Sequence, residues 1–157
     1  MNKINWKKLI LAVLICQAAG WVGSIFTAAT VSNWYLTLNK PSFNPPGWVF
    51  GPVWTTLFLL MGIALYLIWG KKNFKADSYA ILFFTIQYLL NIFWSFLFFY
   101  LQNPLAAFIE IIILWIFILL TIIYFYKISK PAGWLLIPYL LWVSFAAFLN
   151  YNLVILN

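Results

Sequence analysis

Residues 104–126 read PLAAFIEIIILWIFILLTIIYFY, an almost unbroken apolar run that contains a single charged side chain, Glu110. A run of about 20 apolar residues is long enough to cross a bilayer as an α-helix. A membrane-spanning β-strand would instead be about ten residues long and would alternate in polarity. Similar continuous runs recur along the rest of the chain, so we predict an all-α membrane protein.

The apolar runs predict a bundle of five transmembrane helices in one domain, residues 1–157. The expected spans are residues 9–29, 47–69, 79–101, 104–126 and 133–155. The composition agrees, because 66% of the residues are hydrophobic and only 7% are charged, which leaves too little polar surface for a water-soluble globule. The connections are short, so consecutive helices are expected to be antiparallel neighbours.

The lysines predict how the bundle is oriented. Only Lys40 falls on the side opposite the N-terminus, and the others fall on the N-terminal side: Lys3, Lys7, Lys8, Lys71, Lys72, Lys75, Lys127 and Lys130. Positive charge favours the cytoplasmic side, so we expect a multi-pass plasma-membrane protein with a cytoplasmic N-terminus and an external C-terminus. The chain has no arginine, and its net charge of +7 therefore indicates contacts with anionic lipid of the bilayer rather than with nucleic acid.

The residue types exclude several kinds of chemistry. The chain contains no histidine, one cysteine and two acidic residues, so it cannot assemble a metal cluster of ordinary spacing or a hydrolytic triad. No glycine-rich loop followed by Lys and Ser or Thr is present to hold a phosphate. We therefore expect no metal site, no cofactor and no hydrolytic activity.

Polar and aromatic side chains gather instead at one depth, in the outer half of the predicted bundle. With a rise of about 1.5 Å per residue, Trp54 and Glu110 both lie about two turns below the outer surface. Stripes of i, i+4, i+8 spacing lie at a similar depth, with Trp94 beside the first of them: Gln87, Asn91 and Ser95, then Trp142, Ala146 and Asn150. Aromatic walls with a few amide and hydroxyl groups are typical of a ligand pocket.

A structural role remains an alternative for several of these residues. Asn, Gln and Ser within membrane helices often serve as interhelical hydrogen bonds, and this applies to Gln87, Asn91, Ser95 and Asn150. Glu110 is a candidate functional residue, because an unpaired carboxylate within a membrane is costly. Two alternatives are that its carboxyl is protonated and neutral, or that it makes a structural hydrogen bond to a neighbouring helix. Lys40, on the same outer side, is the one nearby cation that could pair with it.

Two further patterns concern packing. Small residues recur every four positions in the first span and predict close approach of another helix: Ala12, Cys16, Gly20, Ser24 and Ala28. Residues 40–54 read KPSFNPPGWVFGPVW, in which the prolines stiffen the loop and Pro46 suits a helix start. This segment is expected to form a rigid cover over the second span and over the pocket.

Three separated motifs together resemble the tryptophan-rich sensory protein family, whose animal members are called translocator protein or peripheral benzodiazepine receptor. They are KPSFNPPGW (40–48) with GPVW (51–54), then Asn91 to Ser95, then Pro138 to Trp142 with Phe145, Ala146, Leu149 and Asn150. The resemblance covers nearly the whole chain. It implies a five-helix bundle, often dimeric, with a pocket beneath the first loop for protoporphyrin IX or a related tetrapyrrole and for isoquinoline or benzodiazepine ligands.

The resemblance also implies which residues line that pocket. The positions that match are Tyr35, Pro45, Trp54, Phe58, Asn91, Trp94, Ser95, Trp142 and Ala146, to which the charge argument adds Glu110. Trp54 and Asn91 would donate N–H groups to a ligand. The resemblance further implies light-dependent breakdown of porphyrin, an activity that bacterial relatives look able to promote, and it makes Trp54 and Trp142 the candidate catalytic residues of a photooxidation.

The resulting hypothesis is a membrane protein that binds a tetrapyrrole and acts in tetrapyrrole and stress regulation. A small proton-coupled carrier of porphyrins or other hydrophobic solutes that uses Glu110 is the alternative, although the chain shows no inverted repeat. A regulator that binds a protein partner without chemistry is a third possibility.

Overall fold

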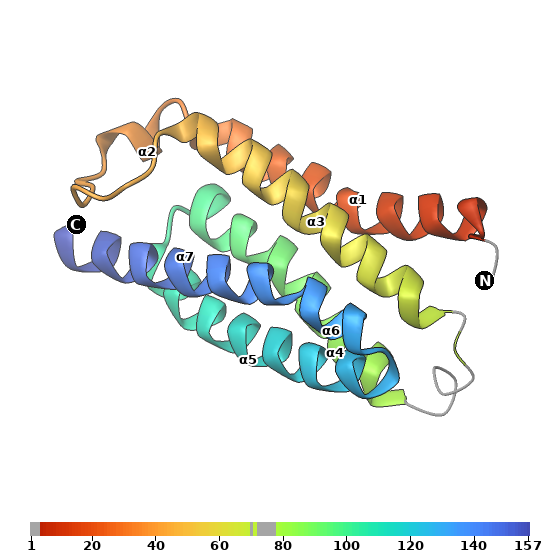
Figure 1. The fold of residues 1–157 in the computed structure, drawn as a ribbon. Coiled ribbons are helices and arrows are strands. Elements are labelled where there is room, and N and C mark those ends of the chain that lie inside the picture. The colour runs from red at the N-terminus through yellow and green to blue at the C-terminus, as the bar shows by residue number, and fades with distance from the viewer. Residues whose placement is uncertain (1–3, 70, 72–77) are drawn as a thin grey trace.

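The computed structural model describes residues 4–69, 71 and 78–157, and these residues form helices joined by turns and irregular segments (Figure 1). The long helices are α1 (Trp6–Thr30), α3 (Gly47–Trp69), α4 (Ser78–Ser95), α5 (Pro104–Ile128) and α7 (Ile137–Leu156). The short ones are α2 (Trp34–Thr37), the π-helical turn η2 (Phe96–Tyr100) and α6 (Lys130–Leu135).

Five segments of the described chain are long and apolar enough to cross a membrane. They are Trp6–Thr30, Gly47–Trp69, Tyr79–Tyr100, Pro104–Ile128 and Lys130–Leu156. The predicted all-α fold with five membrane-length helices is therefore confirmed. The start of α1 and the end of α7 lie at opposite ends of the bundle (Figure 1).

Local chemistry accounts for the starts of two long helices. The side-chain oxygen of Asn5 accepts the backbone N–H of Lys8 at 3.1 Å, and that of Asn103 accepts the backbone N–H of Ala106 at 2.9 Å. Each asparagine thus caps backbone groups that the first turn of a helix leaves without a partner. Pro104 occupies the first turn of α5, where its missing N–H costs nothing.

Two of the predicted spans are irregular in the structure. The fifth, predicted at 133–155, changes from α6 to α7 at Leu136, because Pro138 in the first turn of α7 has no N–H for the carbonyl of the turn before it. The third, predicted at 79–101, ends in η2, where the Leu101 N–H donates to the Phe96 carbonyl at 2.9 Å. The chain then reverses at Gln102, whose φ is 50°.

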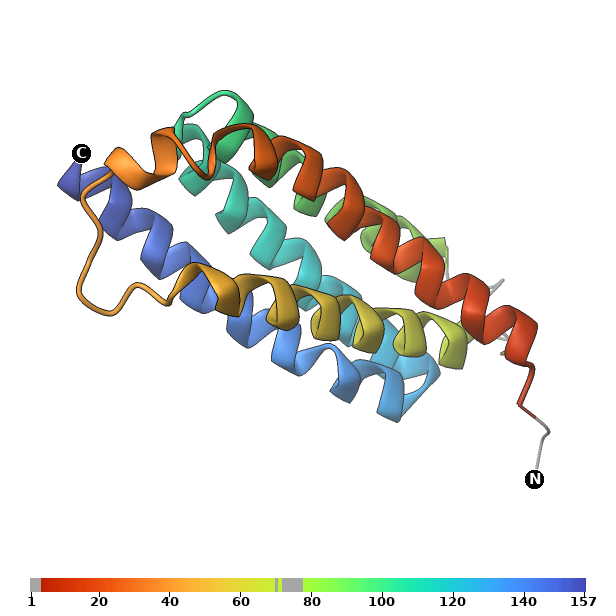
Figure 2. The same ribbon diagram turned by 90° about the horizontal axis from the view of Figure 1, so that it is seen from above.

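The helices form a ring around a shared core. Helix α1 packs between α3 and α4, α5 packs between α4 and α7, and α3 also contacts α6 (Figures 1 and 2). Among the described helices, α3 and α7 do not form a closely packed pair. Figure 2 shows α1 and α3 diverging toward the end of the bundle where α2 and the irregular residues after it join them.

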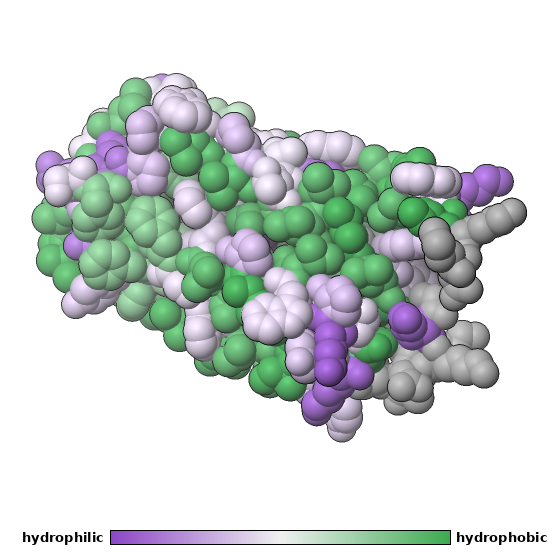
Figure 3. Space-filling model, in the orientation of Figure 1, coloured by the Kyte–Doolittle hydropathy of each residue, from purple (hydrophilic) through white to green (hydrophobic). Residues whose placement is uncertain are grey.

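We call the end that carries residues 31–46 the loop end. The opposite end, which we call the lysine end, carries Lys7, Lys8, Lys71, Lys127 and Lys130. Lys3, Lys72 and Lys75 lie outside the described residues. The surface between the two ends is mostly hydrophobic, and strongly hydrophilic residues gather toward the ends (Figure 3), as expected for a bundle that crosses a membrane.

Small residues of α1 permit the close packing of that helix, as predicted. The buried set of small residues differs from the predicted set, however. Ala12 and Cys16 are buried, whereas Ser24 and Ala28 at the far end of the predicted stripe are exposed. Each step of four residues advances about 40° around a helix, so a stripe of that spacing turns away from its partner. The buried face continues instead through Ala19 and Gly23.

Gly62 of α3 lies against the backbone of α1. A Cβ built on Gly62 would stand 2.6 Å from Val13 Cα, whereas a Cβ on Gly51 of the same helix would meet nothing within 4 Å. We expect Gly62→Ala to lower the free energy of unfolding by at least about 1 kcal/mol, because α1 and α3 must move apart. Thermal unfolding in detergent would measure it, and Gly51→Ala is the matched control. Equal stabilities of the two variants would contradict this packing.

Candidate functional site

Contacts between helices place several of the predicted site residues in one layer, near the loop end. The Trp94 Nε1–H donates to Asn150 Oδ1 at 3.1 Å, and Asn150 Nδ2 donates to the Pro104 carbonyl at 2.8 Å. The end of α4, the start of α5 and the last turns of α7 are therefore level with one another. Glu110 lies about 9 Å further along α5 from Pro104.

The segment between α1 and α3 is tied to the end of α7. The Asn39 backbone N–H donates to Asn157 Oδ1 at 2.9 Å, and Asn157 Nδ2 donates to the Asn39 carbonyl at 3.1 Å. The ring of Phe43 stacks on that of Phe148 with centroids 5.3 Å apart. Figure 2 shows this segment passing by the C-terminal end of α7 on its way to α3. The segment therefore lies across the loop end of the bundle.

Tyr35 and Pro45 belong to this segment and are both half-buried. The Tyr35 hydroxyl donates to Asn44 Oδ1 at 3.1 Å, and the Tyr35 ring contacts that of Phe99 at 5.9 Å. Burial raises the pKa of Tyr35 above its usual value, so its hydroxyl stays a hydrogen-bond donor at neutral pH. Tyr35 thus links two parts of this segment to each other through Asn44, and it links the segment to η2 through Phe99.

Below this segment, aromatic rings of α3 and α7 meet across the space between the two helices. Trp54 stacks on Phe58 with centroids 5.4 Å apart and meets the Tyr139 ring edge-on at 6.2 Å. Trp142 meets Phe50 edge-on at 6.0 Å. Trp54 and Trp142 are half-buried, and Phe58 is buried against Gly20 of α1. The structure therefore brings these predicted aromatic residues together between α3 and α7.

A buried hydrogen-bond chain runs beside these rings. Asn91 Nδ2 donates to the Tyr139 hydroxyl at 2.8 Å, and that hydroxyl donates to Gln87 Oε1 at 3.0 Å. Tyr139 is only 1% exposed. The amide of Asn91, expected to face a ligand, thus joins α4 to α7, which is the structural alternative that its residue type left open. Asn150 likewise links α7 to α4 and α5.

Tyr139 belongs to the polar and aromatic set of the predicted fifth span, together with Trp142, Ala146 and Asn150, but it was not among the candidate ligand residues. It lies on the predicted fifth span at the depth of Asn91, but off the i, i+4 stripe that begins at Trp142. A tyrosine in the middle of an apolar span needs a hydrogen-bond partner for its hydroxyl. Its position in the sequence could therefore have indicated a polar partner on a neighbouring helix.

Ser95 does not join the same group. Its Oγ lies 3.1 Å from the position that a Cβ on Gly23 would occupy, so Ser95 faces α1. Ser95 therefore points in a different direction from Gln87 and Asn91, because residues spaced by four drift about 40° around the helix at each step.

Two further predicted site residues lie nearby. Trp94 stacks on Phe98 with ring centroids 5.1 Å apart, and Ala146 is half-buried on α7.

Glu110 is 5% exposed, and neither of its carboxyl oxygens has a hydrogen-bond partner in the described part of the chain. Lys40, the cation that could have paired with Glu110, does not do so. Lys40 Nζ donates to the Leu38 carbonyl at 3.1 Å and lies 4.8 Å from the centre of the Tyr35 ring. A lysine ammonium prefers to stay at the surface while its stem covers apolar groups, and Lys40 accordingly remains at the loop end.

A second buried polar group also lacks a partner. The Nε1–H of Trp142 is buried and has no acceptor among the described residues. The layer therefore contains an acceptor, the Glu110 carboxyl, and a donor, the Trp142 indole, that are both unsatisfied. Such groups are rare in folded proteins and call for an explanation.

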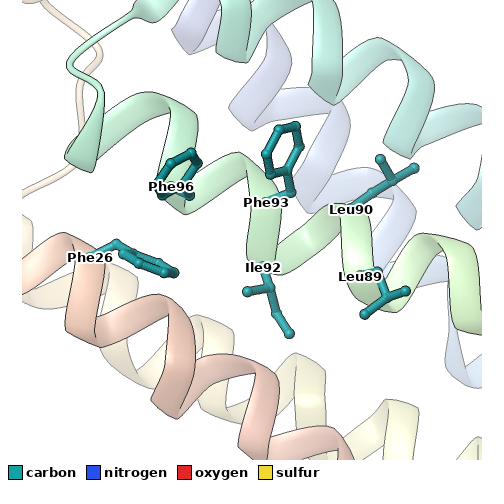
Figure 4. Close-up of a pocket in the computed structure, with 6 residues that line it drawn as sticks. All are labelled: Phe26, Leu89, Leu90, Ile92, Phe93 and Phe96. Atoms are coloured by element: carbon teal, nitrogen blue, oxygen red, sulfur yellow. The ribbon is translucent and has the colours of Figure 1, made fainter.

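A hollow on the surface of the bundle lies outside the aromatic layer. It has a volume of about 470 Å³ and is formed by Phe26 of α1 with residues of α4 and η2: Leu89, Leu90, Ile92, Phe93 and Phe96 (Figure 4). All six lining residues are hydrophobic, and none of them belongs to the predicted site.

Among the described residues, no group of three His, Cys, Asp or Glu side chains could hold a metal ion.

These features define a multi-pass helical membrane protein in which aromatic rings and unsatisfied polar groups gather in one half of the bundle. Residues 12–156 match the TspO/MBR family. The chain belongs to this family.

Individual relatives agree with that assignment. The tryptophan-rich protein TspO of Chlorobaculum tepidum is 49% identical over 95% of both chains. The protein of the same name from Archaeoglobus fulgidus is 48% identical over 98% of this chain and 99% of its own length. The translocator protein of Ovis aries is 33% identical over 94% of this chain and 89% of its own.

Proposed function

We propose that the protein binds protoporphyrin IX or a related tetrapyrrole in the aromatic layer near the loop end. The observation that carries this proposal is the presence of two buried and unsatisfied polar groups, Glu110 and the Trp142 indole, within an aromatic shell. A ligand that offers both a donor and an acceptor would satisfy both groups at once. Burial without such a ligand costs about 1 to 3 kcal/mol for each group.

The chemistry of a tetrapyrrole matches this environment. Its macrocycle is flat and apolar and would stack on Trp54 and Trp142, a propionic acid side chain in its protonated form would donate to the Glu110 carboxyl, and the other side-chain carboxylate is an acceptor for an indole N–H. The rings of Trp54 and Trp142 now contact Tyr139 and Phe50. A ligand would therefore enter by separating these rings. Isoquinoline and benzodiazepine ligands, which carry aromatic rings and carbonyl groups, would use the same layer.

The tryptophans also suit a light-dependent reaction. With dissolved O2 as the oxidant, a porphyrin that absorbs light between Trp54 and Trp142 would take one electron from an indole and pass it to O2, which leaves an oxidised indole and superoxide beside the pigment. The polar groups of the site lie in one half of the bundle, which favours binding over a proton-coupled carrier with alternating access.

The proposed setting is the plasma membrane, with the lysine end in the cytoplasm. Five described lysines lie at that end, and Lys40 lies at the loop end, which is the distribution expected for a cytoplasmic N-terminus. The ligand layer would then lie in the outer half of the membrane. We further propose that the protein forms a homodimer, as the family resemblance implies.

Titration of the purified protein with protoporphyrin IX, followed by tryptophan fluorescence, tests the proposed site. We expect the double variant Trp54→Phe/Trp142→Phe to bind at least about tenfold more weakly, since a tenfold change corresponds to about 1.4 kcal/mol. Light-dependent loss of the pigment should fall as well. The matched control is Trp134→Phe, which changes an exposed tryptophan at the lysine end. Unchanged affinity and unchanged pigment loss in the double variant would refute the site.

A further inference from the structure

A second hollow, of about 320 Å³, lies at the lysine end between α5 and the α6–α7 segment. Its walls include Ile122 and Ile123 of α5 and Ile137 of α7, and its rim includes Lys127 and Trp134. We call this hollow the lysine-end groove. It is separate from the aromatic layer, because none of its residues belongs to the candidate site.

Close packing of α6 on α5 shapes the groove. A Cβ on Gly133 would stand 2.7 Å from Tyr126 Cβ and 3.0 Å from Tyr126 Cα, so only a glycine fits there. Gly133 is buried and brings no side chain to the groove, whereas Ile123 is partly exposed along it. The result is an apolar groove on the outer surface of the bundle, which in a membrane faces the lipid acyl chains.

The rim of the groove has the residues of a membrane–water interface. Trp134 is 64% exposed, and its ring meets that of Tyr126 at 6.4 Å. Lys127 is exposed in the last turn of α5, and its Nζ lies 4.4 Å from the centre of the Tyr124 ring. Trp, Tyr and Lys at helix ends characteristically lie at the level of lipid headgroups.

The positive charge of Lys127 is not neutralised by the described part of the chain. The one acidic side chain described, Glu110, lies about 25 Å away along α5. Lys130 follows in the next turn and adds a second positive charge at the same end. A cation at the mouth of an apolar groove is complementary to a molecule with an anionic head and a hydrocarbon tail. A second copy of the chain in this groove would instead bring like charges together.

We propose that the lysine-end groove binds an anionic phospholipid, with an acyl chain along Ile123 and Ile137 and the headgroup phosphate at Lys127. The apolar walls exclude a free phosphate or a polar solute as the occupant. The charge at the rim selects an anionic over a zwitterionic headgroup, because each lysine near such a lipid contributes favourably.

Native mass spectrometry of the full chain tests this proposal, with phosphatidylglycerol and phosphatidylcholine of identical acyl chains added in equal amounts. The wild-type protein should retain phosphatidylglycerol about fivefold over phosphatidylcholine. Lys127→Gln should bring that ratio close to one. Ile123→Trp should reduce retention of both lipids, because the new ring fills the groove and leaves every charge in place.

Two controls separate a groove from a charged surface. Lys8→Gln removes a charge from the same end but outside the groove, and it should leave the lipid ratio unchanged. Ile123→Phe is a smaller filling variant to be used if Ile123→Trp does not fold, as judged by its unfolding midpoint. Equal effects of Lys8→Gln and Lys127→Gln, or full lipid retention in the folded filling variant, would overturn the proposal.

Discussion

Replacement of Glu110 with leucine is expected to raise the free energy of unfolding by about 2 to 3 kcal/mol. The carboxyl group of Glu110 is buried and has no hydrogen-bond partner in the described structure. Leucine has a similar size and needs no such partner, so the substitution removes a desolvation cost without leaving a cavity. Titration with a denaturing detergent, followed by tryptophan fluorescence, would measure the change.

The same variant is expected to lose function while it gains stability. Leucine cannot accept a hydrogen bond, so the affinity for protoporphyrin IX should fall about tenfold. Glu110→Gln is the matched control, because it keeps the size and an acceptor oxygen and should change stability far less. A destabilised Glu110→Leu variant would show that a neighbouring helix holds the carboxyl, and the assignment of Glu110 to a ligand would then be wrong.

Tyr139→Phe is expected to lower the free energy of unfolding by about 2 kcal/mol. The Tyr139 hydroxyl accepts from Asn91 and donates to Gln87, and all three residues are buried. Its removal leaves an amide donor and an amide acceptor unsatisfied inside the bundle, which costs more than the loss of one surface hydrogen bond. Thermal unfolding in detergent would show the loss as a lower midpoint.

Tyr151→Phe is the control for Tyr139→Phe. Tyr151 lies on the same helix, is exposed, and contacts Phe108 only through its ring. Its phenylalanine variant should therefore unfold like the wild type. A double-mutant cycle of Tyr139→Phe with Gln87→Leu should also show a coupling of at least about 0.5 kcal/mol between the two sites. Additive effects would mean that the hydrogen-bond chain does not act as a unit.

The fold was predictable because apolar run length is a direct signal. In residues 104–126 only Glu110 and Thr121 interrupt the hydrophobic sequence after Pro104, and α5 extends over that whole range. The irregular ends were not predicted. The π-helical turn at Phe96–Tyr100 depends on how the aromatic rings pack against their neighbours, which no residue in that stretch specifies alone. Pro138 could have indicated the change from α6 to α7.

The depth of the candidate residues along the bundle could be predicted from the sequence, but the partners of each side chain could not. Counting residues along each span predicted a common depth for Trp54, Asn91 and Trp142. In the structure both Trp54 and Asn91 contact Tyr139 of α7, and Trp142 lies one turn further along that helix. Helix rotation is decided by packing between helices, so counting could not show that Ser95 faces Gly23. It also could not show that Lys40 stays with backbone carbonyls rather than reaching Glu110.

The tie between the α1–α3 segment and the end of α7 has a kinetic consequence. Any molecule that enters beneath this segment must wait for the Asn39–Asn157 hydrogen bonds and the Phe43–Phe148 stack to open together. Residence time would then be governed by residues that never touch the ligand. Equilibrium affinity would depend on Glu110 and Trp142 instead, so evolution could adjust how long a ligand stays separately from how tightly it binds.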